Sequence, residues 1–340
     1  MPHADLDIEH PEELIAYMRE AGRLEPGETP RIEILAGGVS NKTVFFEPEF
    51  GQTLVLKQAL AKLRVKADWF SDPARVHREA EGLRALIELA PVGTITPLAF
   101  EDERVHLLAM YAVPKPHENW KELLLAGRLE SGHVAAFAEL LGTIQRRAHE
   151  RREELAARFA DRRFFESLRL EPYYAYAAEH VPEAAGFLHA LIAAARARTL
   201  TLVHGDYSPK NVLIHKGRLV LLDHEVIHWG DPAFDIGFAL THFLSKAHHL
   251  PAQRTAFADA AILFWNSYLE ALGEVPWRGD LEACAVRHTL GCLLARVAGR
   301  SPLEYLNPDA RARQRAAVCA LMTSPPPSIP ALCGEFLAQL

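Results

Sequence analysis

A short segment near the middle of the chain carries the side chains best suited to chemistry. Residues 202–214 read LVHGDYSPKNVLI, so Asp206 is followed five positions later by Asn211 and then by an apolar stretch typical of a strand. A second apolar stretch ends at Asp223, twelve residues after Asn211. A hairpin of these two strands would bring Asp206, Asn211 and Asp223 to one edge of a small sheet.

The types and order of these three residues point to transfer of a phosphoryl group to a hydroxyl. That reaction depends on positioning and charge stabilisation more than on covalent help from the protein. Asp206 is suited to orient the hydroxyl and accept its proton, while Asn211 and Asp223 offer the hard oxygen ligands that Mg²⁺ prefers. The same order of Asp, Asn and Asp occurs in the kinase signature. The sequence therefore predicts a kinase.

A phosphate-binding lysine and its acidic partner are expected upstream. Lys57 lies in the third predicted strand, where alternation puts Val55 and Lys57 on one face and Leu54 and Leu56 on the other. Glu79 follows in a predicted helix. A Lys57–Glu79 ion pair would hold the ammonium toward the α- and β-phosphates of a nucleotide.

The turn between the first two predicted strands reads GGVSN, from Gly37 to Asn41. Backbone N–H groups and short polar side chains in such a turn can surround phosphates. The turn lacks the G-x-G-x-x-G spacing, so its interpretation depends on its place before Lys57. We expect Gly37, Gly38, Ser40 and Asn41 to contact the nucleotide.

The pattern of the chain changes near residue 112. Before it, a helix at 11–21 and one at 72–89 accompany predicted strands at 31–34, 43–46, 53–57, 95–100 and 105–111. After it, helical periodicity dominates, at 133–152, 174–197, 234–248, 255–272, 281–298 and 309–322. We therefore predict an α+β protein with a small, mostly antiparallel sheet in residues 1–112 and a mainly helical part in residues 113–340.

Composition restricts the class of protein further. Lys and Arg total 37 against 44 Asp and Glu, and this net charge of −7 argues against nucleic acid as the main partner. No apolar run reaches the roughly 18 residues of a membrane span, and the polar N-terminus is unlike a signal peptide. The four cysteines form no CxxC pair, as expected of free thiols in a reducing compartment. We expect a cytoplasmic protein whose partner is a small-molecule hydroxyl acceptor, with no membrane partner; a homodimer stays open.

The motifs HGDYSPKNVLI and LLDHEVIHWGDPAFDIG resemble those of the aminoglycoside phosphotransferase and choline kinase superfamily, the small-molecule relatives of protein kinases. By motif order the resemblance covers residues 30–300. It implies a two-lobe, protein-kinase-like fold with an N-lobe over 1–112 and a C-lobe over 113–340. It also implies ATP and Mg²⁺ as cofactors and a small metabolite or aminoglycoside-like molecule as the acceptor.

Matched position by position, the resemblance assigns roles to the residues of the predicted site. Asp206 is then the catalytic base, Asn211 and Asp223 hold Mg²⁺, and Lys57 with Glu79 forms the phosphate-lysine pair.

The resemblance also extends to residues outside that group. Met110, Ala112 and Val113 fall where such enzymes bind adenine at the hinge between the lobes. Asp235 and His204 are implied to brace the catalytic loop.

One subgroup of the superfamily shares further features with this chain. Residues 56–60 (LKQAL), Trp69 and Glu79 are similar to the N-lobe of S-methyl-5-thioribose kinases, and residues 294–299 (LARVAG) are similar to their arginine segment. That subgroup usually lacks an asparagine at the position of Asn211. A thioribose-kinase-like sugar kinase is therefore an alternative within the broader kinase interpretation.

Several alternatives stay open at the level of sequence. Glu225 can bind metal or a substrate hydroxyl, or can form a salt bridge in a loop. Arg296 can line an acceptor pocket or lie on a solvated helix face. The cluster of His204, His224 and His228 raises a metal-dependent hydrolase as a rival. A non-catalytic, nucleotide-binding pseudokinase is the other rival.

Overall fold

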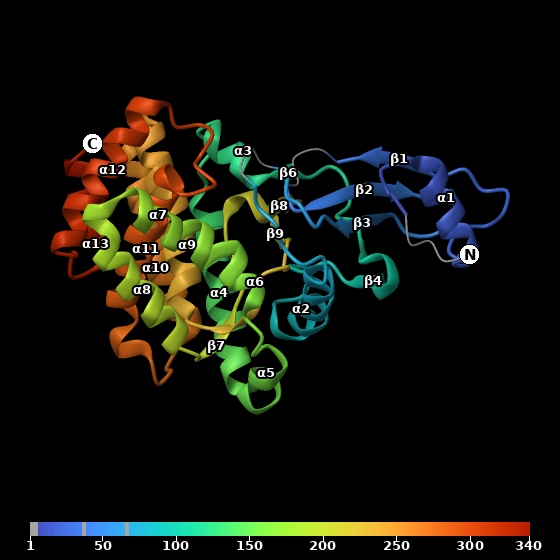
Figure 1. Ribbon diagram of the computed structural model, residues 1–340, viewed down its shortest axis with the longest axis horizontal. Coiled ribbons are helices and arrows are strands. Elements are labelled where there is room, and N and C mark those ends of the chain that lie inside the picture. Colours follow the sequence, from blue (N-terminus) through green and yellow to red (C-terminus); the bar gives the residue numbers. More distant parts are fainter. Residues whose placement is uncertain (1–5, 36–38, 65–67) are drawn as a thin grey trace.

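A five-stranded antiparallel sheet forms the first part of the chain, and helices form most of the remainder (Figure 1). The computed structural model describes residues 6–35, 39–64 and 68–340. In the sheet the strands follow the order β1-β2-β3-β5-β4. Their bounds are β1 (Arg31–Ile34), β2 (Asn41–Glu47), β3 (Leu54–Ala59), β4 (Leu98–Asp102) and β5 (Leu107–Tyr111). The predicted α+β class, with a small antiparallel sheet before a mainly helical part, is confirmed.

The two faces of this sheet have different environments, as the alternation in β3 predicted. Leu54 and Leu56 face α1 (Pro11–Glu20) and pack in a small cluster with Leu14 and Met18. Val55, on the opposite face, packs against the large core of the molecule. Lys57 shares that face, so the pleat of β3 directs its side chain toward the rest of the protein.

Helix α2 (Arg75–Leu89) connects the sheet to the helical part. Val76, Leu83 and Leu86 on α2 are at most 1% exposed and belong to the same core as Leu202 and Val203. In Figure 1, α2 lies between the sheet and the helices. One continuous apolar core therefore holds both parts of the chain.

The strand predicted at 95–100 is displaced in the structure. Pro97 has no N–H to donate to a ladder, and β4 begins after it at Leu98. Ile95 instead forms an isolated bridge with Leu221. After β4 the chain forms a 3₁₀ turn over Glu103–Val105.

The C-terminal part is mainly helical, and α4 packs on α10 while α9 packs on α11. Its helices are α3 (Trp120–Leu125), α4 (Ser131–Glu150), α5 (Arg152–Arg158), α6 (Arg163–Phe165), α7 (Tyr176–His180), α8 (Ala185–Ala197), α9 (Pro232–His249), α10 (Arg254–Leu272), α11 (Arg278–Ala298), α12 (Pro308–Thr323) and α13 (Ile329–Ala338). Across the described ranges, no helix is both long and apolar enough to cross a membrane.

The helix predicted at 174–197 is divided in the structure. A π-helical segment, η2 (Glu166–Ala175), precedes α7, and the chain breaks at Val181 before α8. Pro182 explains the break because proline lacks the N–H that a continuous helix needs. Such π-helical segments occur often at functional sites.

Two small sheets carry the motif residues. Strand β7 (Thr201–Val203) pairs with β10 (His228–Gly230), and β8 (Val212–His215) pairs with both β6 (Glu118–Asn119) and β9 (Arg218–Leu221). The predicted hairpin of β8 and β9 is confirmed. It lies where the five-stranded sheet meets the helices (Figure 1).

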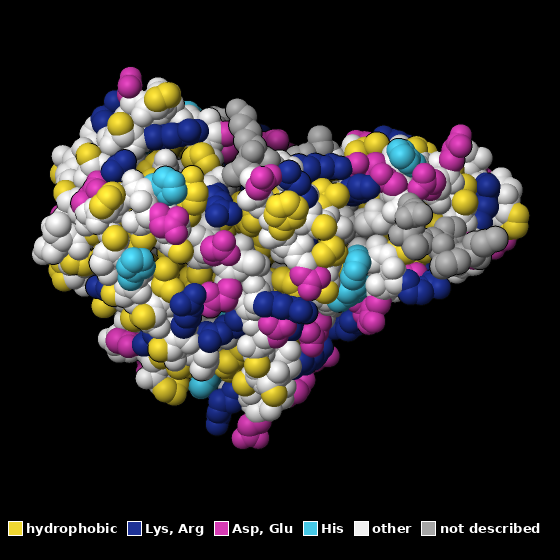
Figure 2. Space-filling view, in the orientation of Figure 1, with side chains coloured by type: hydrophobic (Ala, Val, Ile, Leu, Met, Phe, Trp, Pro, Cys, Tyr) yellow, Lys and Arg dark blue, Asp and Glu magenta, His cyan; other side chains and the backbone are white. Residues whose placement is uncertain are grey.

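The surface of the molecule is electrostatically mixed on the face shown in Figure 2. Lys and Arg side chains alternate there with Asp and Glu, and the N-terminal end is narrower than the helical part.

Candidate active site

The loop after β7 holds its shape through the buried carboxylate of Asp235, in the first turn of α9. Asp235 accepts hydrogen bonds from the backbone N–H groups of His204 (2.7 Å) and Gly205 (2.8 Å). Gly205 has a φ of +77°, and a Cβ there would lie 2.7 Å from Val226, so only glycine fits. Burial raises the pKa of Asp235 to about 7, although the two N–H groups favour its charged form.

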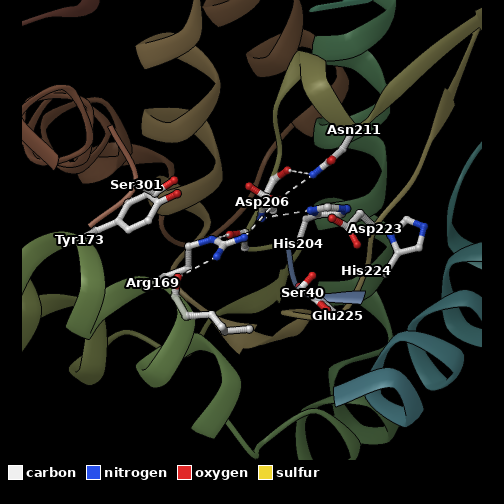
Figure 3. Close-up of polar contacts among 12 residues, drawn as sticks. Ser40, Arg169, Tyr173, His204, Asp206, Asn211, Asp223, His224, Glu225 and Ser301 are labelled. Carbon is white, nitrogen blue, oxygen red and sulfur yellow. Dashed lines mark hydrogen bonds and ion pairs between the residues drawn. The ribbon is translucent and has the colours of Figure 1, made fainter. Parts of the chain in front are cut away.

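Asp206 follows Gly205 and is held on one oxygen (Figure 3). Its Oδ2 accepts from Asn211 Nδ2 at 2.8 Å and lies 3.1 Å from Arg169 Nη2. Its backbone N–H donates to His204 Nδ1. Burial alone would raise the pKa of Asp206, but the charges of Arg169 and Lys210 outweigh it and hold that pKa below its ordinary value. Asp206 is therefore ionised at neutral pH.

His204 supports this loop as a neutral ring. Burial lowers the pKa of His204 to about 4, so Nδ1 is free to accept the Asp206 N–H.

Lys57 forms the centre of a buried charge cluster drawn from three parts of the chain. Its Nζ lies 2.7 Å from Glu79 Oε1 on α2 and 2.9 Å from Asp223 Oδ1 after β9. Burial opposes the charge of the lysine, but the attraction of Asp223 and Glu79 holds the pKa of Lys57 well above its ordinary value. A fixed ammonium thus faces the cleft.

Asp223 and Asn211 present oxygen atoms that suit a hard cation. Asp223 has a φ of +67°, a conformation that non-glycine residues adopt rarely and mostly at functional positions. The Oδ1 atom of Asp223 contacts Lys57. The Asn211 side-chain NH₂ group donates to Asp206, so its Oδ1 atom points away from Asp206. Both residues line the same cavity. Carboxylate and amide oxygens are the ligands Mg²⁺ prefers, so the donor set fits this ion.

The phosphate-loop prediction falls partly outside the described residues, because Gly37 and Gly38 are not among them. Ser40 and Asn41 line the larger of two cavities, described below. The Asn41 amide donates to Glu225 Oε2 at 3.0 Å. The structure therefore ties Asn41 to the loop after β9.

Glu225 and Arg75 connect this loop to the start of α2. Arg75 is fully buried, and its Nε lies 3.1 Å from Glu225 Oε2. The same guanidinium donates to the backbone carbonyls of Ser40 and Leu60. Of the alternatives for Glu225, the structure shows the salt bridge.

Two cavities meet at the motif residues. The larger cavity, about 480 Å³, lies between the five-stranded sheet and the β8–β9 hairpin, and Lys57, Asn211 and Asp223 line it. The smaller cavity, about 270 Å³, contains Asp206 and lies among η2, α9 and the loop after α11. Ser40, Lys121, Lys210 and Asp223 line both, so the cavities share a border beside the loop that carries Asp206.

The predicted hinge residues Met110, Ala112 and Val113 line the larger cavity. Ala112 N–H already donates to Thr53 O at 2.9 Å. Among the described residues, the Val113 N–H has no such partner. Val113 therefore offers a donor to a molecule in this cavity.

Arg296 lies in the wall of the smaller cavity. Its Nη1 donates to Tyr173 OH at 3.2 Å and to Ser301 Oγ at 3.0 Å. Of the two alternatives for Arg296, the structure shows the cavity position.

Three charged residues of the site carried no sequence signal of their own. Arg169, on η2, contacts Asp206 from 37 positions away in the chain. Arg75 occupies an ordinary helix start. Lys210 lies within the motif, but only the border between the two cavities distinguishes it.

The histidines behind the hydrolase alternative have other surroundings. His228 Nδ1 contacts Val226 O, and its ring stacks on Phe165. His204 receives the Asp206 N–H. Throughout the described ranges, no three His, Cys, Asp or Glu side chains gather to hold a metal ion.

Comparisons with known proteins agree with this geometry. The class that the fold and site define is a phosphotransferase with a kinase-like fold. The sequence matches the model of the phosphotransferase enzyme family over residues 31–275, and the chain belongs to that family. No curated protein sequence gives a significant match.

Solved structures with the same fold share little sequence with this chain. A choline/ethanolamine kinase family protein from Mesorhizobium loti is 19% identical with a TM-score of 0.54, covering 92% of this chain and 93% of its own. Amicoumacin kinase hAmiN, solved with AMP-PNP, Ca²⁺ and Ami, is 14% identical with a TM-score of 0.57, covering 92% and 94%. The macrolide 2′-phosphotransferase MphH from Brachybacterium faecium is 17% identical with a TM-score of 0.51, covering 92% and 99%. These likenesses show the fold.

Proposed function

We propose that this protein is an ATP-dependent kinase that transfers the γ-phosphate to a hydroxyl of a small molecule. The observation that carries the proposal is the border between the two cavities. Lys57 and Asp223 lie on one side of it, and the ionised Asp206 lies on the other. A nucleotide and a second small molecule can therefore meet at the catalytic loop.

The larger cavity is the nucleotide site of this proposal. The Val113 N–H would bind the adenine, and Val55 and Met110 would pack on the base. Lys57, held by Glu79, would bind the phosphates. Ser40 and Lys210 lie at the border, where the γ-phosphate would be placed. The lobe boundary would then fall at Ala112–Val113, between adenine contacts.

Asn211 and Asp223 would hold Mg²⁺, which supplies positive charge to the phosphates when bound. The Asn211 amide also orients Asp206, so one side chain would serve both the metal and the base.

Asp206 would act on the hydroxyl in the smaller cavity. Its Oδ2 is already engaged by Asn211 and Arg169, whereas Oδ1 makes no hydrogen bond within the described residues. Oδ1 would therefore orient the hydroxyl and accept its proton as the new O–P bond forms and the bond to the β-phosphate breaks. The products are a phosphate monoester and ADP. A fixed Lys57 ammonium would stabilise the charge of the transferred group.

The experiment that tests the proposal combines binding with turnover. Mg·AMP-PNP binding would be measured by calorimetry, and ADP release would be measured against a panel of small alcohols, sugars and aminoglycosides. Asp206→Asn should reduce ADP release about 10³-fold and leave AMP-PNP affinity within about threefold. Asp259→Asn, an exposed acid on α10, is the matched control.

Two results would contradict the proposal. Full activity of Asp206→Asn would remove the base from the mechanism, and nucleotide binding without acceptor-dependent ADP release would support the pseudokinase alternative. Trp69 and Arg296, which lie in the segments similar to thioribose kinases, both line the smaller cavity. A methylthioribose-like sugar therefore belongs in the panel.

A further inference from the structure

The smaller cavity has an unequal balance of charge once its ion pairs are assigned. Four acids line it, and each forms an ion pair with a Lys or Arg. Two of these cations lie outside the cavity wall. The pairs are Asp206 with Arg169, Asp223 with Lys57, Glu225 with Arg75, and Glu304 with Lys121. Of the four Lys and Arg residues that line the cavity, Arg296 and Lys210 have no acidic partner in the described part of the chain. Lys57 is also shared with Glu79, so the six cations face five acids and the surplus is one positive charge.

Of the two unpaired cations, Arg296 lines only the smaller cavity, whereas Lys210 also lines the larger one. The bonds of Arg296 to Tyr173 and Ser301 use Nη1. Its Nη2 has no hydrogen bond within the described residues, yet it is not among the fully buried unpaired atoms. Arg296 thus keeps an accessible donor with a fixed direction.

A second cation lies directly behind the cavity wall. Lys246 on α9 is fully buried, and its one hydrogen bond goes to the carbonyl of His242 at 3.3 Å. Its ammonium lies 5.6 Å from the ring of Tyr305, and both His242 and Tyr305 line the cavity. Burial and the nearby charges of Lys121 and Arg296 lower the pKa of Lys246 to about 7. An anion in the cavity would relieve this repulsion.

The position of Arg296 relative to the reacting atoms is suited to a bifunctional molecule. Arg296 and Asp206 line the same cavity. In Figure 3, Tyr173 and Ser301, the partners of Arg296, lie to the left of the pair formed by Arg169 and Asp206. A small molecule that reaches Arg296 at one end can therefore place a hydroxyl at Asp206 with the other.

We propose that the acceptor is a small alcohol bearing an anionic group, a carboxylate or a phosphate, that binds Arg296 while its hydroxyl faces Asp206. This inference rests on the kinase function proposed above. Guanidinium groups match the geometry of both anions. A polycationic aminoglycoside would meet Arg296 as a like charge, which is unfavourable in a partly buried site.

The first test measures anion binding directly. Sulfate would be titrated into the protein saturated with Mg·AMP-PNP, so that the phosphate site of the larger cavity is already filled. We expect millimolar sulfate affinity in the wild type and at least a tenfold loss in Arg296→Met. Arg296→Lys, which keeps the charge but not the planar set of donors, should lose less sulfate affinity than Arg296→Met. Arg287→Met, on the same helix and outside both cavities, is the matched control.

The second test identifies the anion. ADP release would be compared within matched acceptor pairs: hydroxy acids against their amides, and sugar phosphates against the free sugars. The proposal expects the charged member of one pair to exceed its neutral partner at least tenfold in kcat/KM. Arg296→Met should raise KM for that acceptor tenfold or more and change kcat less than threefold.

Defined results would overturn this inference. Sulfate affinity that is absent in wild type, or unchanged in Arg296→Met, would contradict it, as would a preference for neutral or cationic acceptors. Failure of the kinase function itself is seen separately. In that case Mg·AMP-PNP does not bind or Asp206→Asn keeps full ADP release, whereas the difference in sulfate affinity between wild type and Arg296→Met can still be measured without the nucleotide.

Discussion

The larger and smaller cavities border the same catalytic loop but are built in different ways. The polar wall of the larger cavity is a closed charge cluster in which Lys57 joins Glu79 and Asp223. The smaller cavity contains acids that are all paired and an arginine, Arg296, that is not. In the proposed function, the first would hold one highly charged ligand through a metal and a lysine. The second leaves a charge open, and that open charge is where specificity for the acceptor can reside.

Among the variants that separate the two cavities, removal of the proposed metal ligand Asp223 should have the largest effect on activity. Asp223→Ala is expected to reduce ADP release about 10³-fold, since a metal ion contributes several kcal/mol of charge stabilisation. EDTA should reduce ADP release by the wild type to a similar extent. Added Mg²⁺ should then restore ADP release in the wild type and not in the variant. Sulfate affinity in the smaller cavity should change little. An equally large loss of sulfate affinity and of ADP release in Asp223→Ala would show that the two cavities are not independent.

Arg75 tests the connection between the sheet and the loop after β9. It is fully buried and paired with Glu225. Arg75→Met leaves Glu225 without its cation, and breaking such a buried pair costs about 3–5 kcal/mol. Chemical denaturation would measure the loss. The control is Arg84→Met, whose partly exposed pair with Glu101 is expected to contribute about 1 kcal/mol or less. Similar losses in both variants would contradict a structural role for Arg75.

Substitution of Lys57 tests the role of the charge cluster in the larger cavity. Lys57→Met should lower kcat/KM for ATP about 10²-fold and also destabilise the fold, because Glu79 and Asp223 then lack their shared cation. Adding Glu79→Gln to Lys57→Met should recover stability without recovering activity. Lys62→Met, at an exposed ion pair, is the control. Recovery of activity in the double variant would contradict a phosphate-binding role for Lys57.

Arg169 tests the smaller cavity through the pH dependence of the reaction, and here the expected effect is smallest. The cation holds the pKa of Asp206 below its ordinary value. Arg169→Met removes that charge, so the pKa of Asp206 rises and the acidic limb of the kcat/KM profile moves to higher pH. At pH 8, where Asp206 is ionised in both proteins, activity should fall by about tenfold or less through lost orientation. An unshifted acidic limb would show that Asp206 is not the group titrating.

The sequence predicted the larger cavity far better than the smaller one. Lys57, Asn211 and Asp223 lie on or beside strands, where alternation and the ends of strands determine direction within a few residues. Glu79 follows from helical spacing on α2. These relations are local, so a single sequence reveals them.

The smaller cavity depends on contacts between distant segments. Arg169, His242 and Arg296 come from η2, α9 and α11, and they meet only because α9 packs on α11 and η2 packs beside α11. The π-helical path of η2 gives no periodic signal that distinguishes it from an α-helix. The displaced start of β4 has a local cause, Pro97, but the pairing of Ile95 with Leu221 that accompanies it is tertiary.

By itself, the sequence determined the class of fold, the order of the sheet and helical parts, and the candidate base, metal ligands and phosphate lysine. Short-range geometry suffices for these, because strands and helices repeat every two or 3.6 residues. Only the tertiary structure decided which carboxylate each cation pairs with. Charge interactions act through space and depend on burial. One arginine can therefore be paired with a carboxylate while another, in a different environment, is open to a ligand. For this protein that difference separates Arg169, bound to Asp206, from Arg296, which remains free to receive an anion.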